Sequence, residues 1–325
     1  MKNKQVLLAA RPTGAVEESH FKIVESDIPR PNEGEFVVRA HYLSLDPYMR
    51  GRMDNEKSYA AKAELGKVMV GSVVGEVIES RHEKFTAGDF AVVGTGWQEY
   101  GLSNGTGARK VDPKRIPLSA YLGVAGMPGV TAWIGLNEHG SPKAGETVVV
   151  SAASGAVGSA VGQLAKMKGC RAVGIAGGRD KCDYVVNELG FDACIDYKAG
   201  GLREKLEAAC PRGIDAYFEN VGGEILDTVL GLMNVKSRIA LCGLISDYNR
   251  TESYGVKMFR SILVNRIKLQ GLIVFDWLPR YAEANQALLE MHAAGKLKTR
   301  ESVLEGIESA PRGLIGLLKG ANFGK

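Results

Sequence analysis

The sequence predicts an α/β protein that has a doubly wound parallel sheet in its second part and a smaller β-rich domain before it. Its 325 residues suit two domains, each large enough to bury a core of its own. Short β-branched runs fill the chain up to about residue 120, and beyond about residue 146 apolar strands alternate with helical stretches. We expect the β-rich domain over residues 1–122, rejoined by residues 296–325, and the parallel-sheet domain over residues 123–295.

Individual elements can be placed from these patterns. The β-rich part holds strand candidates bounded by Gly, Asp or Pro, at Phe36–Ala40, Gly71–Ile78 and Phe90–Val93. The second part holds candidates at Thr147–Val150, Ala172–Ala176, Ala193–Ile195, Ala216–Glu219, Ile239–Cys242 and Leu269–Val274. Helices are expected over Ser159–Lys168 and near Arg280–Ala294, and the tail Leu297–Lys325 is expected to form a strand, a helix and a glycine-rich end. The cluster Gly123–Gly129 is the candidate hinge.

Composition and charge exclude several function classes. The net charge of +4 comes from 41 basic and 37 acidic residues that are mixed along the chain, so no run of basic residues indicates nucleic-acid binding. No stretch approaches the roughly 18 consecutive apolar residues that span a bilayer, and the polar start lacks the apolar core of a signal peptide. We therefore expect a cytoplasmic protein that binds neither nucleic acid nor membrane.

The cysteines and histidines do not form a metal-site pattern. The 5 cysteines are widely and irregularly spaced without a Cys-x-x-Cys pair, which favours reduced core thiols: Cys170, Cys182, Cys194, Cys210 and Cys242. Residues 1–169 contain no cysteine, so the histidines there lack the thiolate partners of a zinc alcohol dehydrogenase: His20, His41, His82 and His139. We expect no metal site, which argues against zinc-assisted alcohol oxidation.

A dinucleotide fingerprint follows the first strand of the second part. Thr147–Val150 runs into Ser151–Gly158 and then into a helix, which is the context that a phosphate-binding loop requires. Ala153 replaces the first glycine of the usual G-x-G-x-x-G pattern, whereas Gly155 and Gly158 keep the positions that admit a pyrophosphate and pack the helix closely. The pattern indicates a Rossmann domain, with the pyrophosphate at the helix N-terminus.

The end of the second strand favours NADPH over NADH. An NAD site usually carries Asp or Glu there for the ribose hydroxyls, but this chain has Gly177–Lys181, with Arg179 and Lys181 as cations. A ribose 2′-phosphate is therefore favoured. The alternative is that both cations are solvated charges at the start of a helix.

Motifs throughout the chain carry a family resemblance: Leu45–Met53, Gly126–Ala132, Ala152–Gly158, Phe218–Gly223, Cys242–Asn249 and Gly320–Lys325. In order and over nearly the whole chain, they resemble the zinc-independent medium-chain dehydrogenase/reductases. The similar branch is that of the leukotriene B4 12-hydroxydehydrogenases, prostaglandin reductases and alkenal double-bond reductases, together with bacterial curcumin-type reductases. The resemblance implies a GroES-like catalytic domain, a Rossmann domain that binds NADPH, and a homodimer.

The resemblance also implies site residues. It places Gly155, Ala156, Val157 and Gly158 on the pyrophosphate and puts Gly178, Lys181 and Tyr197 around the 2′-phosphate. The residues that it places along the rest of the cofactor are Asn220, Cys242, Gly243, Ile245, Ser246, Tyr248 and, over the nicotinamide, Asn322. Two departures stand out. Gly178-Arg179 replaces the Ser and acid of many relatives. Relatives also usually continue beyond the position of Lys325 into one more strand, so either this form is shortened at its end or that last strand is dispensable.

The chemistry that fits without a metal is conjugate reduction. Hydride from NADPH would add to the β-carbon of an apolar α,β-unsaturated aldehyde or ketone, and hydrogen-bond donors would stabilise the enolate oxygen. Tyr48 and Tyr248 are the candidate donors. The alternative role of Tyr48 is packing between the domains, and that of Tyr248 is contact with the cofactor. Arg50 and Arg52 could each either clamp an anionic substrate or form salt bridges at the surface. Of the two, Arg52 is the residue that we predict to contact the substrate.

Two other functions compete with enone reduction. An NADPH quinone oxidoreductase uses the same fold and cofactor on a different acceptor, although Asp46–Arg50 and Cys242–Asn249 resemble the alkenal branch more closely. A non-catalytic NADPH-binding protein is the other alternative, against which the candidate donors and the glycine loop argue.

Overall fold

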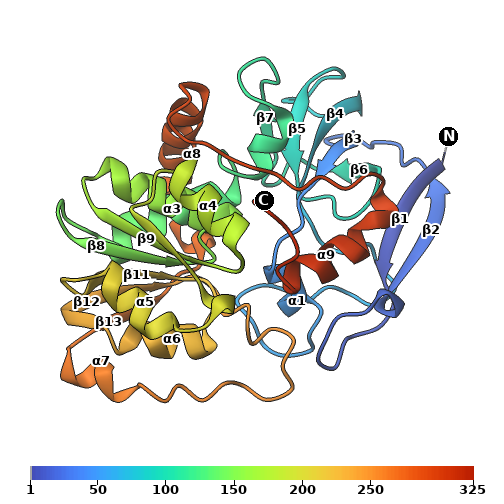
Figure 1. Cartoon of the computed structure of the whole chain (residues 1–325). Helices are drawn as coiled ribbons and strands as arrows, with labels where there is room; N and C mark the ends of the chain where they lie inside the picture. The colour runs from blue at the N-terminus through green and yellow to red at the C-terminus, as the bar shows by residue number, and fades with distance from the viewer. Residues whose placement is uncertain (1) are drawn as a thin grey trace. The chain divides into compact units, whose positions relative to one another are not determined.

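A computed structural model describes residues 2–325 and shows two compact units (Figure 1). One consists of the chain up to Gly123 together with Val303–Ala321, and the other of Val124–Ser302 together with Asn322–Lys325. The division between them falls within the glycine-rich cluster at Gly123–Gly129. The domain boundaries that the sequence analysis places at residues 122 and 296 remain a prediction.

The first unit is built from antiparallel strands. β1 (Lys2–Leu8) pairs with β2 (Phe21–Asp27), and a five-stranded sheet has the order β6-β3-β4-β5-β7. Its strands are β3 (Phe36–Leu43), β4 (Val73–Ser80), β5 (Phe90–Val93), β6 (Tyr100–Ser103) and β7 (Arg109–Val111). The three strand candidates of this part are confirmed as β3, β4 and β5. Gly75 lies beside a bulge of β3, where a Cβ would lie 2.0 Å from the Arg39 carbonyl oxygen.

Short helices complete the first unit: η1 (Glu18–His20), α1 (Tyr48–Arg52), η2 (Leu118–Leu122), η6 (Ile307–Ser309) and α9 (Ala310–Leu318). A buried cluster joins α1, α9 and the first hairpin, through Met49 and Met53 from α1 and its end and Ala310 and Leu314 from α9. Trp97 is fully buried in this cluster and stacks on Phe21 at 5.3 Å between ring centroids. This core fixes the position of α1, the helix that carries Tyr48.

The second unit is a doubly wound parallel sheet with the strand order β10-β9-β8-β11-β12-β13. The strands are β8 (Thr147–Ser151), β9 (Arg171–Ala176), β10 (Ala193–Asp196), β11 (Ile214–Glu219), β12 (Met233–Leu241) and β13 (Lys268–Gly271). Numbered within the unit, this order is the 3-2-1-4-5-6 arrangement of the Rossmann fold. The predicted fold class is thereby confirmed. Ligands of such sheets bind at the carboxyl ends of the strands, beside β8 where the order reverses.

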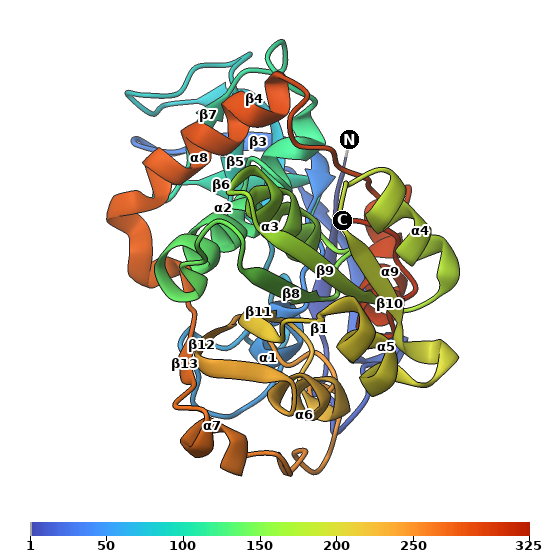
Figure 2. The same cartoon turned by 60° about the vertical axis from the view of Figure 1, so that its left-hand side comes forward.

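Helices cover both faces of this sheet (Figures 1 and 2). They are α2 (Met127–Ile134), η3 (Gly135–Gly140), α3 (Ala156–Met167), α4 (Arg179–Asn187), η4 (Tyr197–Ala199), α5 (Leu202–Ala209), α6 (Gly223–Leu230), α7 (Arg260–Val264), η5 (Val274–Trp277) and α8 (Leu278–Ala293). The turns from β8 into α3 and from β9 into α4 hold the predicted phosphate-binding residues. No helix within residues 2–325 has both the length and the apolar character that crossing a bilayer requires.

Two expectations about the elements are wrong. The last sheet strand was expected to reach Val274, but β13 ends at Gly271 because the chain turns into η5 and then into α8, whose first turn contains Pro279. The strand expected in the tail is absent from the described structure between Leu297 and Lys325. Two main-chain bonds join Lys325 to Ser302 and Arg300, which is too few to form a ladder.

Candidate active site

The loop between β8 and α3 is built by close main-chain packing. The Gly155 N–H donates to the Ala152 carbonyl at 2.9 Å, and Ser159 N–H donates to the Gly155 carbonyl at 2.9 Å, which starts the helix. A Cβ on Gly158 would lie 2.4 Å from the Ala152 carbonyl oxygen, so this position admits only glycine without a shift of the loop. Helix N-termini present N–H groups and a positive dipole end, and this loop therefore offers a cradle for a diphosphate.

The turn after β9 gathers polar and cationic side chains. The Asp196 carboxylate at the end of β10 accepts from Gly178 N–H at 2.8 Å and from Lys198 N–H at 3.0 Å, which ties the two strand ends together. Gly178 has φ +108°, which favours glycine, and a Cβ on Gly177 would lie 2.9 Å from the Tyr197 ring. The predicted residues Gly178 and Tyr197 are therefore neighbours of one turn.

Two lysines bring positive charge to this turn. Burial, and then the nearby positive charge of Lys198, lower the pKa of Lys181. The Lys198 side chain lies against Gly177, since a Cβ there would be 3.0 Å from its Cε atom. Two cations held together repel each other unless an anion lies between them, and a phosphate monoester is such an anion. Arg179 contrasts with them, because its side chain is 90% exposed and pairs with Asp183 at 3.5 Å.

A buried carboxyl group organises the carboxyl ends of β8 and β11. Oε1 of Glu219 accepts from the Ser151 hydroxyl at 2.8 Å and from Val221 N–H at 2.6 Å. Asn220 donates from its main chain to the Ser151 hydroxyl and from its side chain to the Ser151 carbonyl, both at 2.8 Å. Burial is the largest influence on Glu219 and raises the pKa of its carboxyl, although hydrogen bonds from Val221, Gly222 and Ser151 oppose it. This network holds Asn220 at the edge of the sheet where the glycine loop begins.

The loop after β12 carries the remaining predicted cofactor residues. Cys242 N–H and Gly243 N–H both donate to the Glu219 carbonyl, at 2.9 and 3.1 Å, and Ser246 N–H donates to the Val221 carbonyl at 3.0 Å. The Tyr248 hydroxyl oxygen accepts from Leu244 N–H at 3.3 Å. Burial raises the pKa of the Cys242 thiol to about 12, so it stays protonated at neutral pH. The structure thus brings Asn220 and the segment Cys242–Tyr248 together at one edge of the sheet.

Asn322 lies in a tail that is anchored within the second unit. Its side-chain amide donates to the Gly324 carbonyl at 2.7 Å. Phe323 packs edge-on against Tyr184 of α4 and lies under the Arg300 guanidinium, 3.8 Å from its ring centroid. The tail is therefore held beside α4 by ring contacts and by its main-chain bonds to Arg300 and Ser302.

Tyr48 starts α1 in the first unit. Burial, and next the Asp46 carboxylate, raise the pKa of the Tyr48 phenol well above its ordinary value. Asp46 is itself buried and accepts from the Ser44 hydroxyl. A phenol with a raised pKa remains a neutral hydrogen-bond donor across the physiological range. Tyr48 is thus chemically suited to stabilise a developing negative charge on a ligand oxygen.

The two arginines of α1 differ. Arg50 is buried and structural: it pairs with Asp54 at 2.5 Å and donates to the Gly14 carbonyl at 2.9 Å. The alternatives expected for Arg50 were a substrate clamp or a surface salt bridge; a salt bridge forms, in which the Arg50 side chain is buried and Asp54 is 36% exposed. Arg52 has a buried Nε atom that finds no hydrogen-bond partner within residues 2–325. An unsatisfied guanidinium nitrogen is costly, which makes Arg52 the better candidate for a ligand contact.

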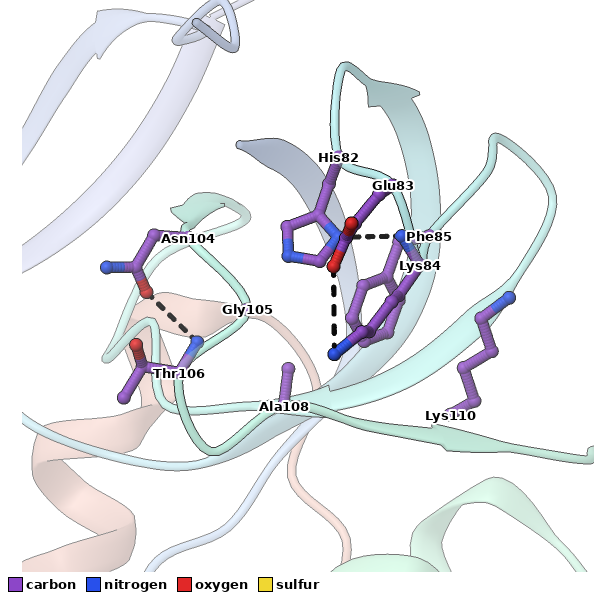
Figure 3. A pocket seen from close by; sticks show the side chains of 9 residues that line it. All are labelled: His82, Glu83, Lys84, Phe85, Asn104, Gly105, Thr106, Ala108 and Lys110. Carbon is purple, nitrogen blue, oxygen red and sulfur yellow. Dashed lines mark hydrogen bonds and ion pairs between the residues drawn. The ribbon is translucent and has the colours of Figure 1, made fainter. Parts of the chain in front are cut away.

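Two of the histidines considered above, His139 and His82, pack against aromatic side chains. His139 lies edge-on to Trp277, and burial lowers its pKa. His82 contacts Phe36 and Phe85 and lines a polar hollow in the first unit (Figure 3). Local contacts engage polar groups of the hollow, such as Lys84 N–H with the His82 ring. Within residues 2–325 we find no group of three or more side chains arranged to hold a metal ion.

Comparison with known proteins follows the same two parts. Residues 4–111 match a family described as the N-terminal domain of oxidoreductase, and residues 156–291 match one described as zinc-binding dehydrogenase. The NADPH-dependent curcumin reductase of Escherichia coli is 46% identical over 100% of this chain and 96% of its own length. The chain belongs to the medium-chain dehydrogenase/reductase family. Within it, the chain falls in the branch of the curcumin, 2-alkenal and prostaglandin reductases, which confirms the resemblance read from the motifs.

Two further relatives support this placement. The NADP⁺-dependent 2-alkenal reductase of Nicotiana tabacum is 44% identical over 99% of this chain and 96% of its own length. The crystal structure of CurA from Vibrio vulnificus in complex with NADPH is 48% identical, covers 99% of this chain and 97% of its own, and superposes with a TM-score of 0.94. The similarity thus extends through both units of the chain.

Lys198 and Glu219 were missed by sequence reasoning. Lys198 follows directly after the predicted Tyr197 on η4. Its proximity to the turn after β9 could therefore have been predicted from the expected pairing of β9 with β10. Glu219 ends a predicted strand, but a carboxylate at a strand end usually indicates a ligand contact rather than a buried anchor. Only the side-chain bonds to Ser151 and Val221 reveal its role.

Proposed function

We propose that this protein is an NADPH-dependent reductase of the carbon–carbon double bond of α,β-unsaturated aldehydes and ketones. The observation that carries the cofactor assignment is the turn after β9, where Lys181 and Lys198 lie together beside Tyr197. Strand β9 ends at Ala176 and is followed by Gly177, in place of the Asp or Glu of an NAD site. The activities for which the curcumin and 2-alkenal reductases are named support both the cofactor and the substrate class.

The second unit supplies the binding groups for NADPH. The loop Gly155–Gly158 holds the pyrophosphate, and Gly178, Lys181, Tyr197 and Lys198 hold the 2′-phosphate. Asn220, Cys242, Gly243, Ile245, Ser246, Tyr248 and Asn322 contact the rest of the molecule. When bound, the reduced nicotinamide supplies a hydride to the β-carbon of the conjugated carbonyl. The protein's own task is then to fix the substrate and stabilise the charge that appears on its oxygen.

Tyr48 performs that task in this proposal. Its hydroxyl donates to the carbonyl oxygen of the substrate, and because its pKa is raised it keeps its proton while negative charge develops there. Tyr248, whose oxygen is fixed by Leu244 N–H, is the second donor candidate and also a cofactor contact. Arg52 binds a polar substituent of the substrate through its guanidinium, which agrees with its unsatisfied buried Nε. Solvent or a nearby hydroxyl returns a proton to the α-carbon.

The decisive experiment follows the near-ultraviolet absorbance of NADPH with a 2-alkenal, an enone and a quinone, with parallel runs on NADH. Oxidation with the first two acceptors, a preference for NADPH and a saturated carbonyl product by mass spectrometry are expected. In Tyr48→Phe we expect kcat to fall by about 100-fold, the usual effect of losing one oxyanion donor. Tyr42→Phe, which changes a 39% exposed tyrosine of the same unit, is the matched control and should retain activity.

The same assay separates the competing functions. Turnover of the quinone alone would replace enone reduction with quinone reduction on the same fold. Fluorescence enhancement of NADPH without oxidation on any acceptor would indicate a binding protein. Equal loss in Tyr48→Phe and Tyr42→Phe would remove the assigned donor role of Tyr48.

We also propose that the protein is a cytoplasmic homodimer. β13 is an edge strand whose residues Lys268–Gly271 are all exposed, and α7 beside it exposes Leu263 at 78%. Exposed sheet edges pair readily with a second copy, which would cover these groups. Light scattering after gel filtration tests the dimer, and a single-chain mass would overturn it.

A further inference from the structure

Two cysteines of the second unit face each other beside the turn after β9. Cys182 lies in the first turn of α4 and Cys194 lies in β10, with their Sγ atoms 3.1 Å apart. Neither belongs to the groups assigned above to NADPH or substrate. Both are free thiols in this structure. Figure 2 shows α4 and β10 at the same end of the parallel sheet.

The local sequence creates room for this pair. Cys194 is the register partner of Gly174 on the neighbouring strand β9. A Cβ on Gly174 would lie 3.2 Å from Cys194 Sγ and 3.0 Å from Val185 of α4. The absence of a side chain at residue 174 therefore leaves the space between sheet and helix to the sulfur atoms. The pair results from packing of three elements and not from a flexible surface loop.

The two thiols differ in their chemical state. The Cys194 thiol donates a hydrogen bond to the Cys182 sulfur, which lowers the pKa of Cys182 and raises that of Cys194. Cys182 is thus the better nucleophile, and Cys194 is the thiol that can resolve an oxidised Cys182. Cys182 is 7% exposed, which restricts the oxidant to small molecules.

We propose that Cys182 and Cys194 are an oxidation site that forms an intramolecular disulfide with a small peroxide as the oxidant. The Cys182 thiolate attacks one peroxide oxygen, the O–O bond breaks, and a sulfenic acid forms at Cys182 while the second oxygen leaves as water. Cys194 sulfur then attacks the sulfenic sulfur, the S–O bond breaks, and a second water leaves. Two thiols lose two electrons and two protons in total, and one hydrogen peroxide becomes two waters.

The disulfide acts on the turn that holds the 2′-phosphate in the proposed function, and this part of the inference rests on that function. Bond formation shortens the separation from 3.1 Å to about 2.05 Å, which draws α4 and β10 together. Lys181 directly precedes Cys182, and Asp196, which bonds Gly178 N–H, lies two residues after Cys194. Displacing these groups by a fraction of an ångström misaligns them, and we expect the 2′-phosphate to bind about tenfold more weakly.

Peptide mapping of the wild-type chain tests the covalent step without any variant. Trypsin leaves both cysteines in the peptide of residues 182–198, and cleavage after Glu188 separates them. After treatment with hydrogen peroxide, we expect this peptide to lose two hydrogen atoms, to resist alkylation, and to remain joined after the second cleavage until it is reduced. Separate alkylation of the two cysteines, or sulfinic acid at Cys182 in place of the bond, would overturn the proposal.

Binding of adenosine 2′,5′-bisphosphate by calorimetry tests the consequence. Peroxide should weaken it about tenfold in the wild type and in Cys210→Ala, which removes a buried thiol of the same unit, but not in Cys182→Ser or Cys194→Ser. A disulfide that forms without a change in affinity would overturn the coupling to the turn. If the reduced protein fails to bind this ligand, the cofactor assignment is at fault, and peptide mapping still decides the oxidation site.

Discussion

The glycine loop after β8 and the lysine turn after β9 are proposed to bind the pyrophosphate and the 2′-phosphate of one cofactor, yet they are built by different means. At the first, a Cβ on Gly158 would meet the Ala152 carbonyl oxygen at 2.4 Å, so main-chain packing fixes the shape. At the second, the shape comes from Asp196 bonding Gly178 and Lys198, and the charge comes from Lys181 and Lys198. A site made of main chain tolerates almost no substitution, whereas a site made of long side chains can be adjusted one charge at a time.

The largest effect is expected from Gly158→Ala. The added methyl group forces the Ala152 carbonyl and the start of α3 apart, which we expect to cost about 3 kcal/mol of unfolding free energy. NADPH binding should fall by more than about 100-fold because the cradle itself is deformed. Urea unfolding and fluorescence titration measure the two effects. Gly255→Ala, where an added Cβ meets nothing within 4 Å, is the matched control; equal behaviour of the two variants would refute the steric account.

A smaller effect is expected where a side chain supports the glycine loop. Glu219→Ala leaves the Ser151 hydroxyl and Val221 N–H without their buried acceptor, at a cost of about 2 kcal/mol. Glu219→Gln keeps an oxygen acceptor and should cost less. Urea unfolding of both variants checks this order, which a Gln variant as unstable as the Ala variant would contradict.

The raised pKa of Glu219 gives the same position a pH dependence. The folded state holds the proton to a higher pH than the unfolded state does, so between the ordinary carboxyl pKa and the raised one the unfolded chain binds fewer protons. Stability should therefore fall as pH rises through this window. Glu219→Gln cannot titrate there, and its unfolding free energy should lack this component of the decline. Parallel slopes for wild type and Glu219→Gln would show that the carboxyl is ionised in both states.

Next in size is the loss of one cation from the lysine turn. Lys181→Ala or Lys198→Ala should each weaken NADPH binding by about tenfold, because each removes one charge-assisted contact to the 2′-phosphate. NADH binding should change little, since it lacks this phosphate. Competitive titrations with both cofactors measure the ratio. A parallel loss for NADH would mean that the lysines support the fold of the turn rather than the phosphate.

The difference between the two regions also explains what the sequence could predict. Gly155 and Gly158 could be predicted from the sequence, because a phosphate site made of main chain needs glycines at fixed spacing after a strand. All six strands of the parallel sheet were likewise predicted, from apolar runs such as Thr147–Val150, whose residues are all buried in β8. Lys198 was not predicted, although the resemblance implied a role for its neighbour Tyr197, because Lys198 comes near Lys181 only through the pairing of β9 with β10. The roles of Arg50 and Arg52 could not be distinguished from the sequence. They differ in the structure, where Arg50 pairs with Asp54 and the Arg52 Nε atom has no hydrogen-bond partner within residues 2–325.

The smallest effect is expected from Arg179→Ala, and it sharpens the comparison because Arg179 stands between Gly178 and Lys181 in the sequence. Its side chain is 90% exposed and paired with Asp183 on the next turn of α4, so solvent screens its charge. NADPH affinity should change by less than about twofold in low salt and still less as salt is added. Titration at two ionic strengths measures this, with Lys181→Ala in the same series. A tenfold loss in Arg179→Ala would place the 2′-phosphate on the exposed side of α4 and would exchange the roles assigned to Arg179 and Lys198.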